Sequence, residues 1–162
     1  MVKSVNDIFF DHGGIDAEAR EEVYKIWVGA AGLKPEEANR RMGEIILLAR
    51  HRQAGIIGIA TAVKTFVSRL QNNLYTYRCF VVPDFRTPGL ETLMIVKAKE
   101  ILAQQAHQDG DKPCVGIVVV VQNELLKRHW RQAVWPGSEM LYIGDSPEGH
   151  HVRVGYFKGA KI

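Results

Sequence analysis

The segment from Val81 to Met94 combines residue types that can bind an anionic group. An apolar strand ends at Pro83, a turn with Arg86 and Gly89 follows, and an amphipathic helix begins after the turn. Backbone amides at the start of a helix, together with the helix dipole, attract phosphate groups. The segment therefore predicts a pyrophosphate site with Arg86 beside it. The alternative is a plain strand-to-helix turn in which Gly89 relieves crowding, because a single glycine turn is a motif of low specificity.

Four other residues are of types that can react or bind metal. Cys79 and Cys114 are too few for a disulfide framework or a four-ligand zinc site. The sequence offers no neighbour that would lower a thiol pKa, so both are interpreted as core packing. His150 and His151 are adjacent on an expected strand edge, where successive side chains point to opposite faces, so they form no metal pair. We expect no metal, reduced thiols and a cytoplasmic location.

Length and composition indicate one globular domain. The chain has 162 residues, of which 46% are apolar and 24% charged, and these values exclude wholesale disorder, a collagen-like repeat and a coiled coil. Residues 1–14 lack the apolar core of a signal peptide, and the longest apolar run, 115–121, is too short to span a membrane. We therefore expect a soluble protein with no membrane partner. A net charge of +3 permits an anionic ligand without requiring a nucleic acid, which is not an expected partner.

Hydrophobic periodicity and turn residues predict the helices and strands that would position these groups. Helices are expected over 16–31, 34–43, 89–107 and 123–133. Strands are expected over 44–51, 56–67, 74–82, 114–121, 140–144 and 152–157, the last two as a hairpin. The strands on either side of the long helix should be parallel, because a helical crossover joins them. The prediction is one domain over 1–162, with an extension at 1–15, a core at 16–157 and helices on the faces of a mixed sheet.

This order of elements resembles the GNAT superfamily of acyl-CoA-dependent N-acyltransferases. The run from Val81 to Arg86 is similar to the end of the family's fourth strand and the start of its pyrophosphate loop. The run from Val118 to Trp130, in which Asn123 opens a helix, is similar to the family's next strand and helix. The likeness implies an α/β (α+β) fold with a mostly antiparallel sheet, a splayed pair of parallel strands and helices on both faces. It also implies transfer of an acetyl group from acetyl-CoA to a primary amine by direct attack.

The resemblance further implies which residues meet the coenzyme. A backbone amide near Phe80, Val81 or Val82 would polarise the thioester carbonyl. Asn123 is expected to contact the coenzyme from the later helix. The pyrophosphate would lie on the turn and the first turns of the long helix, at Arg86, Thr87, Gly89, Leu90, Glu91 and Thr92.

Acid and base groups are assigned by the same likeness. By this resemblance, the Glu44 carboxylate is the base that would deprotonate the incoming amine. The alternative is that Glu44 is a solvated charge at the end of a strand. Trp130 stands where many members have the tyrosine that protonates the leaving thiolate, and an indole is no acid. His129 is the neighbouring candidate, because histidine is a residue type that can exchange a proton near neutral pH. The alternative for it is a surface or partly buried histidine.

Two positions in the loop also depart from the family's pattern. Glu91 stands where the family has glycine or alanine, and its carboxylate would repel a pyrophosphate. Pro88 has no N–H to donate. Together with Trp130, these departures favour a second hypothesis, a catalytically inactive GNAT-fold protein that serves as a binding, regulatory or assembly module.

Two surfaces are candidates for partners, while the amine acceptor is not identified by the sequence. The terminal hairpin predicts a homodimer, because an apolar edge strand favours being covered; its residues are Val152, Val154, Tyr156 and Phe157. Lys127, Arg128 and Arg131 form a basic helix face. That face is interpreted as solvated, and the alternative is contact with a phosphate of coenzyme A or of a nucleic acid.

Overall fold

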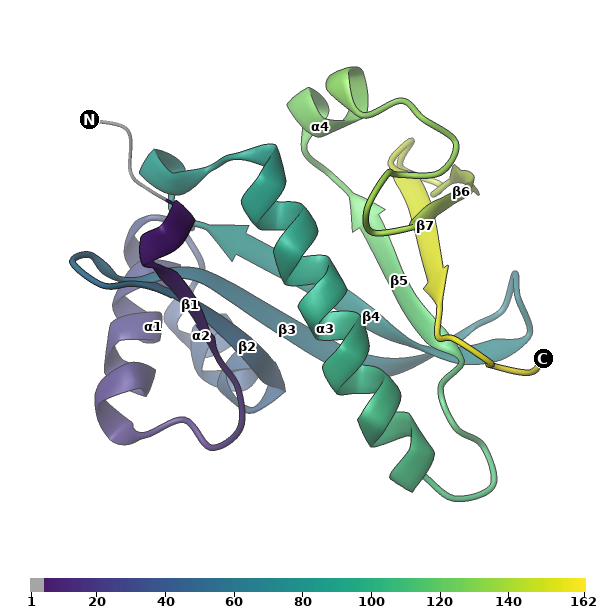
Figure 1. Cartoon of the computed structure of the whole chain (residues 1–162), viewed down its shortest axis with the longest axis horizontal. Helices are drawn as coiled ribbons and strands as arrows, with labels where there is room; N and C mark the ends of the chain where they lie inside the picture. The colour runs from purple at the N-terminus through teal and green to yellow at the C-terminus, as the bar shows by residue number, and fades with distance from the viewer. Residues whose placement is uncertain (1–4) are drawn as a thin grey trace. The chain divides into compact units, whose positions relative to one another are not determined.

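The computed structural model describes residues 5–162 and contains a seven-stranded sheet and four α-helices (Figure 1). The strand order is β1-β2-β3-β4-β5-β7-β6. The helices are α1 (Ala17–Gly29), α2 (Pro35–Arg41), α3 (Pro88–Gln108) and α4 (Glu124–His129). The strands are β1 (Ile8–Asp11), β2 (Ile45–His51), β3 (Gly55–Val67), β4 (Asn72–Val81), β5 (Gly116–Val121), β6 (Leu141–Asp145) and β7 (His151–Tyr156). The sheet is mostly antiparallel with one parallel pair, which confirms the predicted fold class.

The chain forms two compact units, and β3, β4 and α3 each run through both. The first unit contains residues 5–62 and 78–94, and the second contains residues 63–77 and 95–162. The single domain over 1–162 stays a prediction, and the first four residues of the predicted extension lie outside the described residues. Within 5–162, none of the helices combines the length and apolar character that a bilayer-spanning helix needs.

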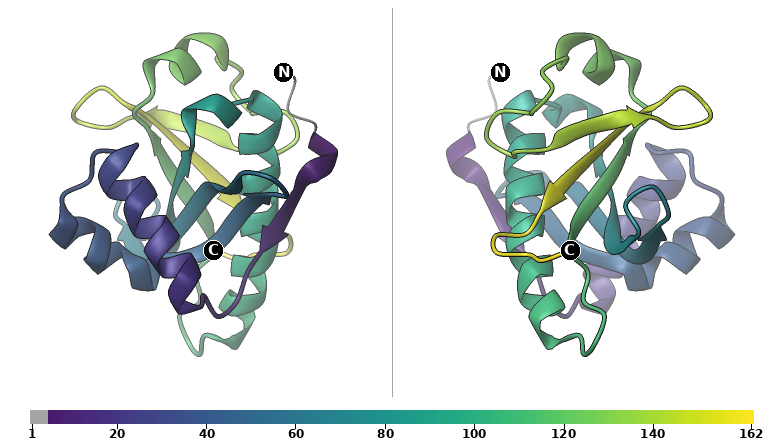
Figure 2. Two further views of the ribbon diagram at one scale, coloured as in Figure 1. Left: turned by 90° about the vertical axis from the view of Figure 1, so that its left-hand side faces the viewer. Right: turned by 90° about the vertical axis from the view of Figure 1, so that its right-hand side faces the viewer.

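In the first unit, helices cover both faces of β3. The Asp16 side chain caps α1 by accepting a hydrogen bond from the Ala19 amide at 2.8 Å. The apolar face of α1 buries Trp27 in a core that includes Ile59 of β3, and α2 packs beside α1 (Figure 2). The adjacent residue of β3, Gly58, faces Met94 of α3 instead. Successive residues of a strand point to opposite faces, so α1 and α3 lie on opposite sides of β3.

Strand β1 lies in the segment that we predicted as an extension. It pairs antiparallel with β2, with Ile8 opposite His51 and Asp11 opposite Leu48. Only the pairing with β2 makes this four-residue segment a strand, since a segment that short has too few residues for a clear alternating pattern.

In the second unit, β4 and β5 pair in parallel through Tyr75 opposite Ile117 and Thr76 opposite Val118. This confirms the predicted crossover. Strand β7 lies between β5 and β6 (Figure 1), so the terminal hairpin is present.

The strand on which we based the homodimer is internal. Val154 of β7 is fully buried, Phe157 is buried just beyond the strand, and β6 is the edge strand. The expectation that β7 is an exposed apolar edge is therefore wrong. The exposed apolar side chains of the edge are Leu141 and Tyr142. The homodimer itself stays a prediction.

Helix α4 is shorter than predicted and ends at His129 rather than near residue 133. Trp130 leaves helical geometry with φ −112° and ψ 65°. Its carbonyl oxygen accepts hydrogen bonds from Trp135 Nε1 at 2.9 Å and from Arg153 Nη2 at 3.2 Å. Arg153 lies 23 residues further along the chain, and with Trp135 it stabilises a turn where sequence periodicity alone would continue the helix.

Candidate functional site

The C-terminal end of β4 presents one backbone amide that does not face β3. The Val82 amide donates to the Ile57 carbonyl oxygen of β3 at 2.8 Å. In an antiparallel pair, successive residues direct their amides alternately toward the partner strand and away from it. Phe80 therefore faces β3 with Val82, whereas Val81 faces away. Three amides were predicted to polarise a thioester carbonyl. Of these, only that of Val81 points away from β3, where it does not pair with that strand.

Arg86 folds back onto this strand end. Its Nε donates to the Val81 carbonyl oxygen at 2.9 Å, and its guanidinium carbon lies 5.4 Å from the centre of the Phe80 ring. A guanidinium over an aromatic face is held by cation–π attraction. Arg86 remains exposed as a residue, so its positive charge is available at the turn.

A short 3₁₀ turn, η3 (Pro83–Phe85), sets the path from β4 to α3. The Phe85 amide donates to the Val82 carbonyl oxygen, and the Arg86 amide donates to the Pro83 carbonyl oxygen. The Phe85 side chain is buried, and its ring centre lies 5.3 Å from that of His51. The buried Phe85 side chain therefore anchors the turn in the first unit.

Thr87 caps helix α3 and uses part of the predicted anion site. The Leu90 amide donates to Thr87 Oγ1 at 3.3 Å and to the Thr87 carbonyl oxygen at 3.1 Å, and the Glu91 amide donates to the same carbonyl at 3.4 Å. Among residues 5–162, no acceptor is recorded for the amides of Thr87 and Gly89. A side-chain carbon at Gly89 would meet no atom within 4 Å, so the space beside this turn is open.

Glu91 and Thr92 are half-buried in the first turns of α3. Burial raises the pKa of the Glu91 carboxyl above its ordinary value, and the nearby Arg86 charge acts in the opposite direction. Glu91 therefore does not point freely into solvent. Its carboxylate lies close enough to Arg86 for the two charges to interact, and the predicted conflict with a bound pyrophosphate stays a prediction.

Asn123 is the N-cap residue of α4. Its Oδ1 accepts hydrogen bonds from the amides of Leu125 at 2.9 Å and Leu126 at 3.2 Å. The contact of Asn123 with the coenzyme remains a prediction. The side-chain oxygen of Asn123 already accepts the two hydrogen bonds that cap α4. His129 is the last residue of the same helix and is exposed.

Glu44 is largely buried rather than a solvated strand-end charge. It ends the 3₁₀ turn η2 (Met42–Glu44) before β2, and 16% of its side chain is exposed. Its Oε1 pairs with Arg40 Nη1 at 2.8 Å. Its Oε2 is buried and has no hydrogen-bond partner among the described residues.

Arg41 lies near Glu44 and was not identified from the sequence. Arg41 Nη2 lies 3.5 Å from Oγ1 of the buried Thr61, and its guanidinium carbon lies 5.5 Å from the Trp27 ring centre. Burial and the charge of Arg78 lower the Arg41 pKa. The spacing of Arg40 and Glu44 at i and i+4 is the sequence signal that could have indicated this cluster. The arrangement places an unpaired carboxylate oxygen among arginines.

The two cysteines differ in their surroundings. Cys114 is buried, as predicted, and burial raises its pKa. Cys79 is exposed, with its Sγ 3.6 Å from Met94 Sδ, so interpreting Cys79 as core packing is wrong. Within the described part of the chain, no three His, Cys, Asp or Glu side chains gather as a metal site.

No protein-family model and no curated protein matches the chain in sequence. Solved structures match its fold. AtaTR bound with acetyl-CoA superposes with a TM-score of 0.62 at 10% identity, over 95% of this chain and 96% of that chain. The ribosomal-protein-S5-alanine acetyltransferase from Vibrio fischeri gives 0.60 at 10% identity over 96% of both. A GNAT-family acetyltransferase from Listeria monocytogenes gives 0.59 at 14% identity, over 92% and 94%. The chain therefore has the fold of the GNAT acetyltransferases.

Proposed function

We propose that this protein is an N-acyltransferase that moves an acetyl group from acetyl-CoA to a primary amine. The observation that carries the proposal is the Val81 amide, which faces away from β3 at the end of β4. A thioester carbonyl lying there would accept its hydrogen bond, and the negative charge that develops during attack would strengthen that bond. The shared fold with acetyltransferases, one of them bound with acetyl-CoA, supports the proposal.

The coenzyme's pyrophosphate would lie at the turn before α3. The amides of Thr87 and Gly89 would donate to it, and Arg86 would supply positive charge. The amides of Leu90 and Glu91 would contribute less, because Thr87 already accepts from both. This is a smaller set of donors than the sequence predicted.

The amine would attack the thioester directly. Glu44 would receive the ammonium proton on Oε2, directly or through water, since Oε1 is already paired with Arg40. The assignment of His129 as the acid that protonates the leaving thiolate stays a prediction from the resemblance. Positioning the amine against the thioester would supply much of the rate enhancement. The reaction would therefore depend less on a residue that protonates the leaving thiolate.

The alternative is a GNAT-fold module that binds or regulates without acyl transfer. The half-buried Glu91 beside Arg86 favours it, because this carboxylate opposes a bound pyrophosphate. The acyltransferase must bind acetyl-CoA, so absence of binding would leave only the alternative.

Titration with acetyl-CoA tests the proposal. We expect a dissociation constant in the micromolar range and a melting temperature that rises with ligand concentration. Arg86→Ala should weaken binding by about 1–3 kcal/mol, because a charged hydrogen bond to phosphate is lost. The control is Arg52→Ala, which removes an exposed arginine from the turn between β2 and β3. No binding by the wild type at about 1 mM ligand would leave only the alternative, and equal loss in both variants would remove the role of Arg86.

Glu91→Gln should both stabilise the protein at pH 7 and tighten coenzyme A binding. The folded-state pKa of Glu91 is raised, so its favourable contribution to stability exists below the unfolded pKa and is lost as pH rises through the folded pKa. The variant should therefore melt higher than the wild type at pH 7, and the difference should vanish below about pH 4. Affinity should rise by about tenfold if about 1.4 kcal/mol of repulsion is relieved.

The matched control for this pair of effects is Glu100→Gln, which neutralises an exposed carboxylate on the same helix. It should change neither melting temperature nor affinity appreciably, because exposed ion pairs contribute little. A Glu91→Gln variant with wild-type affinity would mean that Glu91 does not face the coenzyme.

A further inference from the structure

Arg41 and Arg78 place two positive charges close together in the first unit. Arg41 is the last residue of α2, and Arg78 lies on β4. The next residue of β4, Cys79, contacts Met94 of α3 through its Sγ at 3.6 Å, so the Arg78 side chain points to the opposite face of the strand. Arg41 contacts Thr61 of β3 from α2, which packs beside α1 on that same side.

Neither arginine has a carboxylate at ion-pair distance among residues 5–162. Burial lowers the pKa of Arg41, and the charge of Arg78 lowers it further. The Arg41 Nε is buried and has no hydrogen-bond partner among the described residues. Two like charges near each other and a buried donor without an acceptor both raise the free energy of the folded protein. An anionic group bound beside Arg41 and Arg78 would relieve both.

Arg40 holds the two carboxylates of this neighbourhood. Its Nε and Nη2 donate to Glu37 at 3.1 and 2.8 Å, and its Nη1 donates to Glu44 Oε1 at 2.8 Å. Both carboxylate charges also act on Arg41 from a longer distance, and the three arginines and two glutamates together leave one net positive charge. Glu44 Oε2 is buried without a donor among the described residues. The cluster therefore lacks one donor at Glu44 and one anion at Arg41 and Arg78.

We propose that Arg41 and Arg78 bind the carboxylate of an amino acid, and that this amino acid is the acetyl acceptor. The second half of this proposal rests on the proposed function. Arginine forks donate two parallel hydrogen bonds to a carboxylate, and the ammonium group of the amino acid supplies the donor that Glu44 Oε2 lacks. One small zwitterion thus satisfies both groups, whereas an amine without a carboxylate satisfies only Glu44.

Strand β4 connects the proposed carboxylate site with the thioester. Arg78 precedes Val81 by three residues, or about 10 Å along the strand, and Val81 has the amide assigned to the thioester carbonyl. The amino acid would give one ammonium proton to Glu44, and its nitrogen would form a bond to the acetyl carbon. The carbon–sulfur bond then breaks, and a second proton passes from the nitrogen through water to the thiolate. The products are an N-acetylamino acid and coenzyme A.

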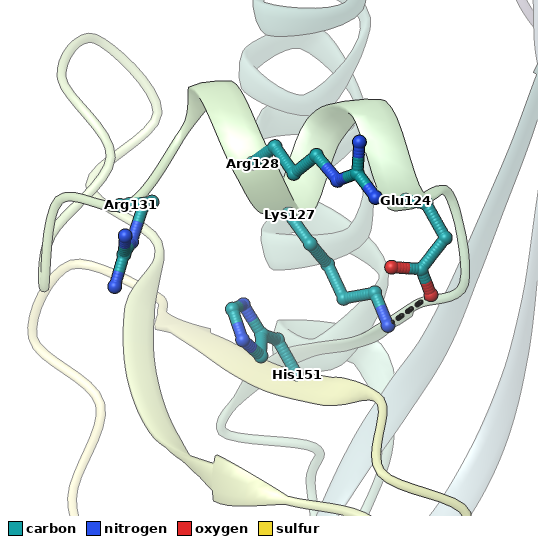
Figure 3. A pocket seen from close by; sticks show the side chains of 5 residues that line it. All are labelled: Glu124, Lys127, Arg128, Arg131 and His151. Carbon is teal, nitrogen blue, oxygen red and sulfur yellow. Dashed lines mark ion pairs between the residues drawn. The ribbon is translucent and has the colours of Figure 1, made fainter.

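Positive side chains in the second unit have carboxylates beside them. A pocket of about 430 Å³ is lined by Glu124, Lys127, Arg128, Arg131 and His151 (Figure 3). Glu124 pairs with Lys127, and its charge also interacts with Arg128. Asp145 Oδ1 lies 4.0 Å from His151 Nε2. The protein's own carboxylates therefore balance much of the charge there, and the arginine pair of the first unit is the stronger candidate for binding an added carboxylate.

Calorimetric titration with amino acids, run with and without coenzyme A, tests binding separately from acyl transfer. The panel contains the protein amino acids, β-alanine and 4-aminobutyrate, and each is compared with its carboxamide. We expect at least one amino acid to bind with a dissociation constant below about 1 mM. Its carboxamide should bind at least about tenfold more weakly, because charged hydrogen bonds are stronger than neutral ones.

Arg78→Gln is the decisive variant, because Arg78 is exposed and its replacement should leave the protein folded. The variant should bind the preferred amino acid at least about tenfold more weakly and the carboxamide within about twofold of the wild type. Arg41→Gln should show the same loss. The matched control is Arg52→Gln, which removes an exposed guanidinium from the first unit and should retain affinity within about twofold.

Three results would overturn the proposal: no saturable binding of any panel member, equal binding of the amino acids and their carboxamides, or equal loss of affinity in Arg78→Gln and Arg52→Gln. Mass spectrometry of the reaction with acetyl-CoA separates this proposal from the proposed function. Amino acid binding that depends on Arg78, without N-acetylated product, would keep the carboxylate site and remove acyl transfer. Product formed equally fast from amines without a carboxylate would keep acyl transfer and remove the amino acid as its acceptor.

Discussion

Replacing Arg153 with alanine is expected to lower the free energy of unfolding by about 3 kcal/mol or more. Arg153 is 1% exposed. Its guanidinium donates to the carbonyl oxygens of Trp130 at 3.2 Å, Ala133 at 3.3 Å and Met140 at 3.2 Å. It also lies over the Trp135 ring, with the guanidinium carbon 4.4 Å from the ring centre. Alanine would remove one of the two donors to each of these carbonyls, leaving only the Trp135 ring and the amides of Tyr142 and Trp135, and would open a cavity.

Chemical denaturation of the wild type and the variant measures this effect. Arg153→Lys separates charge from geometry, because an ammonium keeps the charge and cannot reach three carbonyls as a guanidinium does; it should also be destabilised. Arg69→Ala is the matched control, since Arg69 also bonds two carbonyls, of Ile143 and Asp145, but from an exposed position. A loss in Arg153→Ala no larger than in Arg69→Ala would show that the buried contacts stabilise little.

Gly116→Ala should destabilise the protein by about 3 kcal/mol. Gly116 begins β5 and lies opposite Tyr156 of β7. A side-chain carbon at this position would overlap the Gly155 carbonyl oxygen and lie 2.9 Å from Tyr156 Cα. Both obstacles are backbone atoms, so no side chain can rotate to make room. The pairing of β5 with β7 would have to separate locally.

Thermal unfolding and denaturant titration both report this change. The control is Gly29→Ala at the end of α1, where an added carbon meets no atom within 4 Å. That variant should be unchanged or stabilised by up to about 1 kcal/mol, because alanine favours a helix over glycine. Wild-type stability in Gly116→Ala would mean that the two strands are not so closely packed.

The sequence alone determined most of the local structure of this protein. Asp16 before an amphipathic run specifies the start of α1, and the Asp16 cap is present. The continuous apolar run before Val121 specifies a buried strand, which is β5. The turn around Arg86 and Gly89 was identified for the same reason: such patterns depend on residues a few positions apart. Strand β1 was missed because it is held by pairing with β2, a segment about 40 residues away along the chain.

Only the tertiary structure decided which groups are available for chemistry. In the register of β4 on β3, the Val82 amide donates to β3 and the Val81 amide faces away from it. No local sequence pattern distinguishes these two adjacent valines. The position of β7 inside the sheet removed the basis for a dimer through that strand. The contact of Arg153 with the Trp130 carbonyl holds the turn after α4, and this turn brings Arg131 to the same pocket as His151 of β7. Such contacts depend on strand order and register, which arise from packing between segments far apart in the chain.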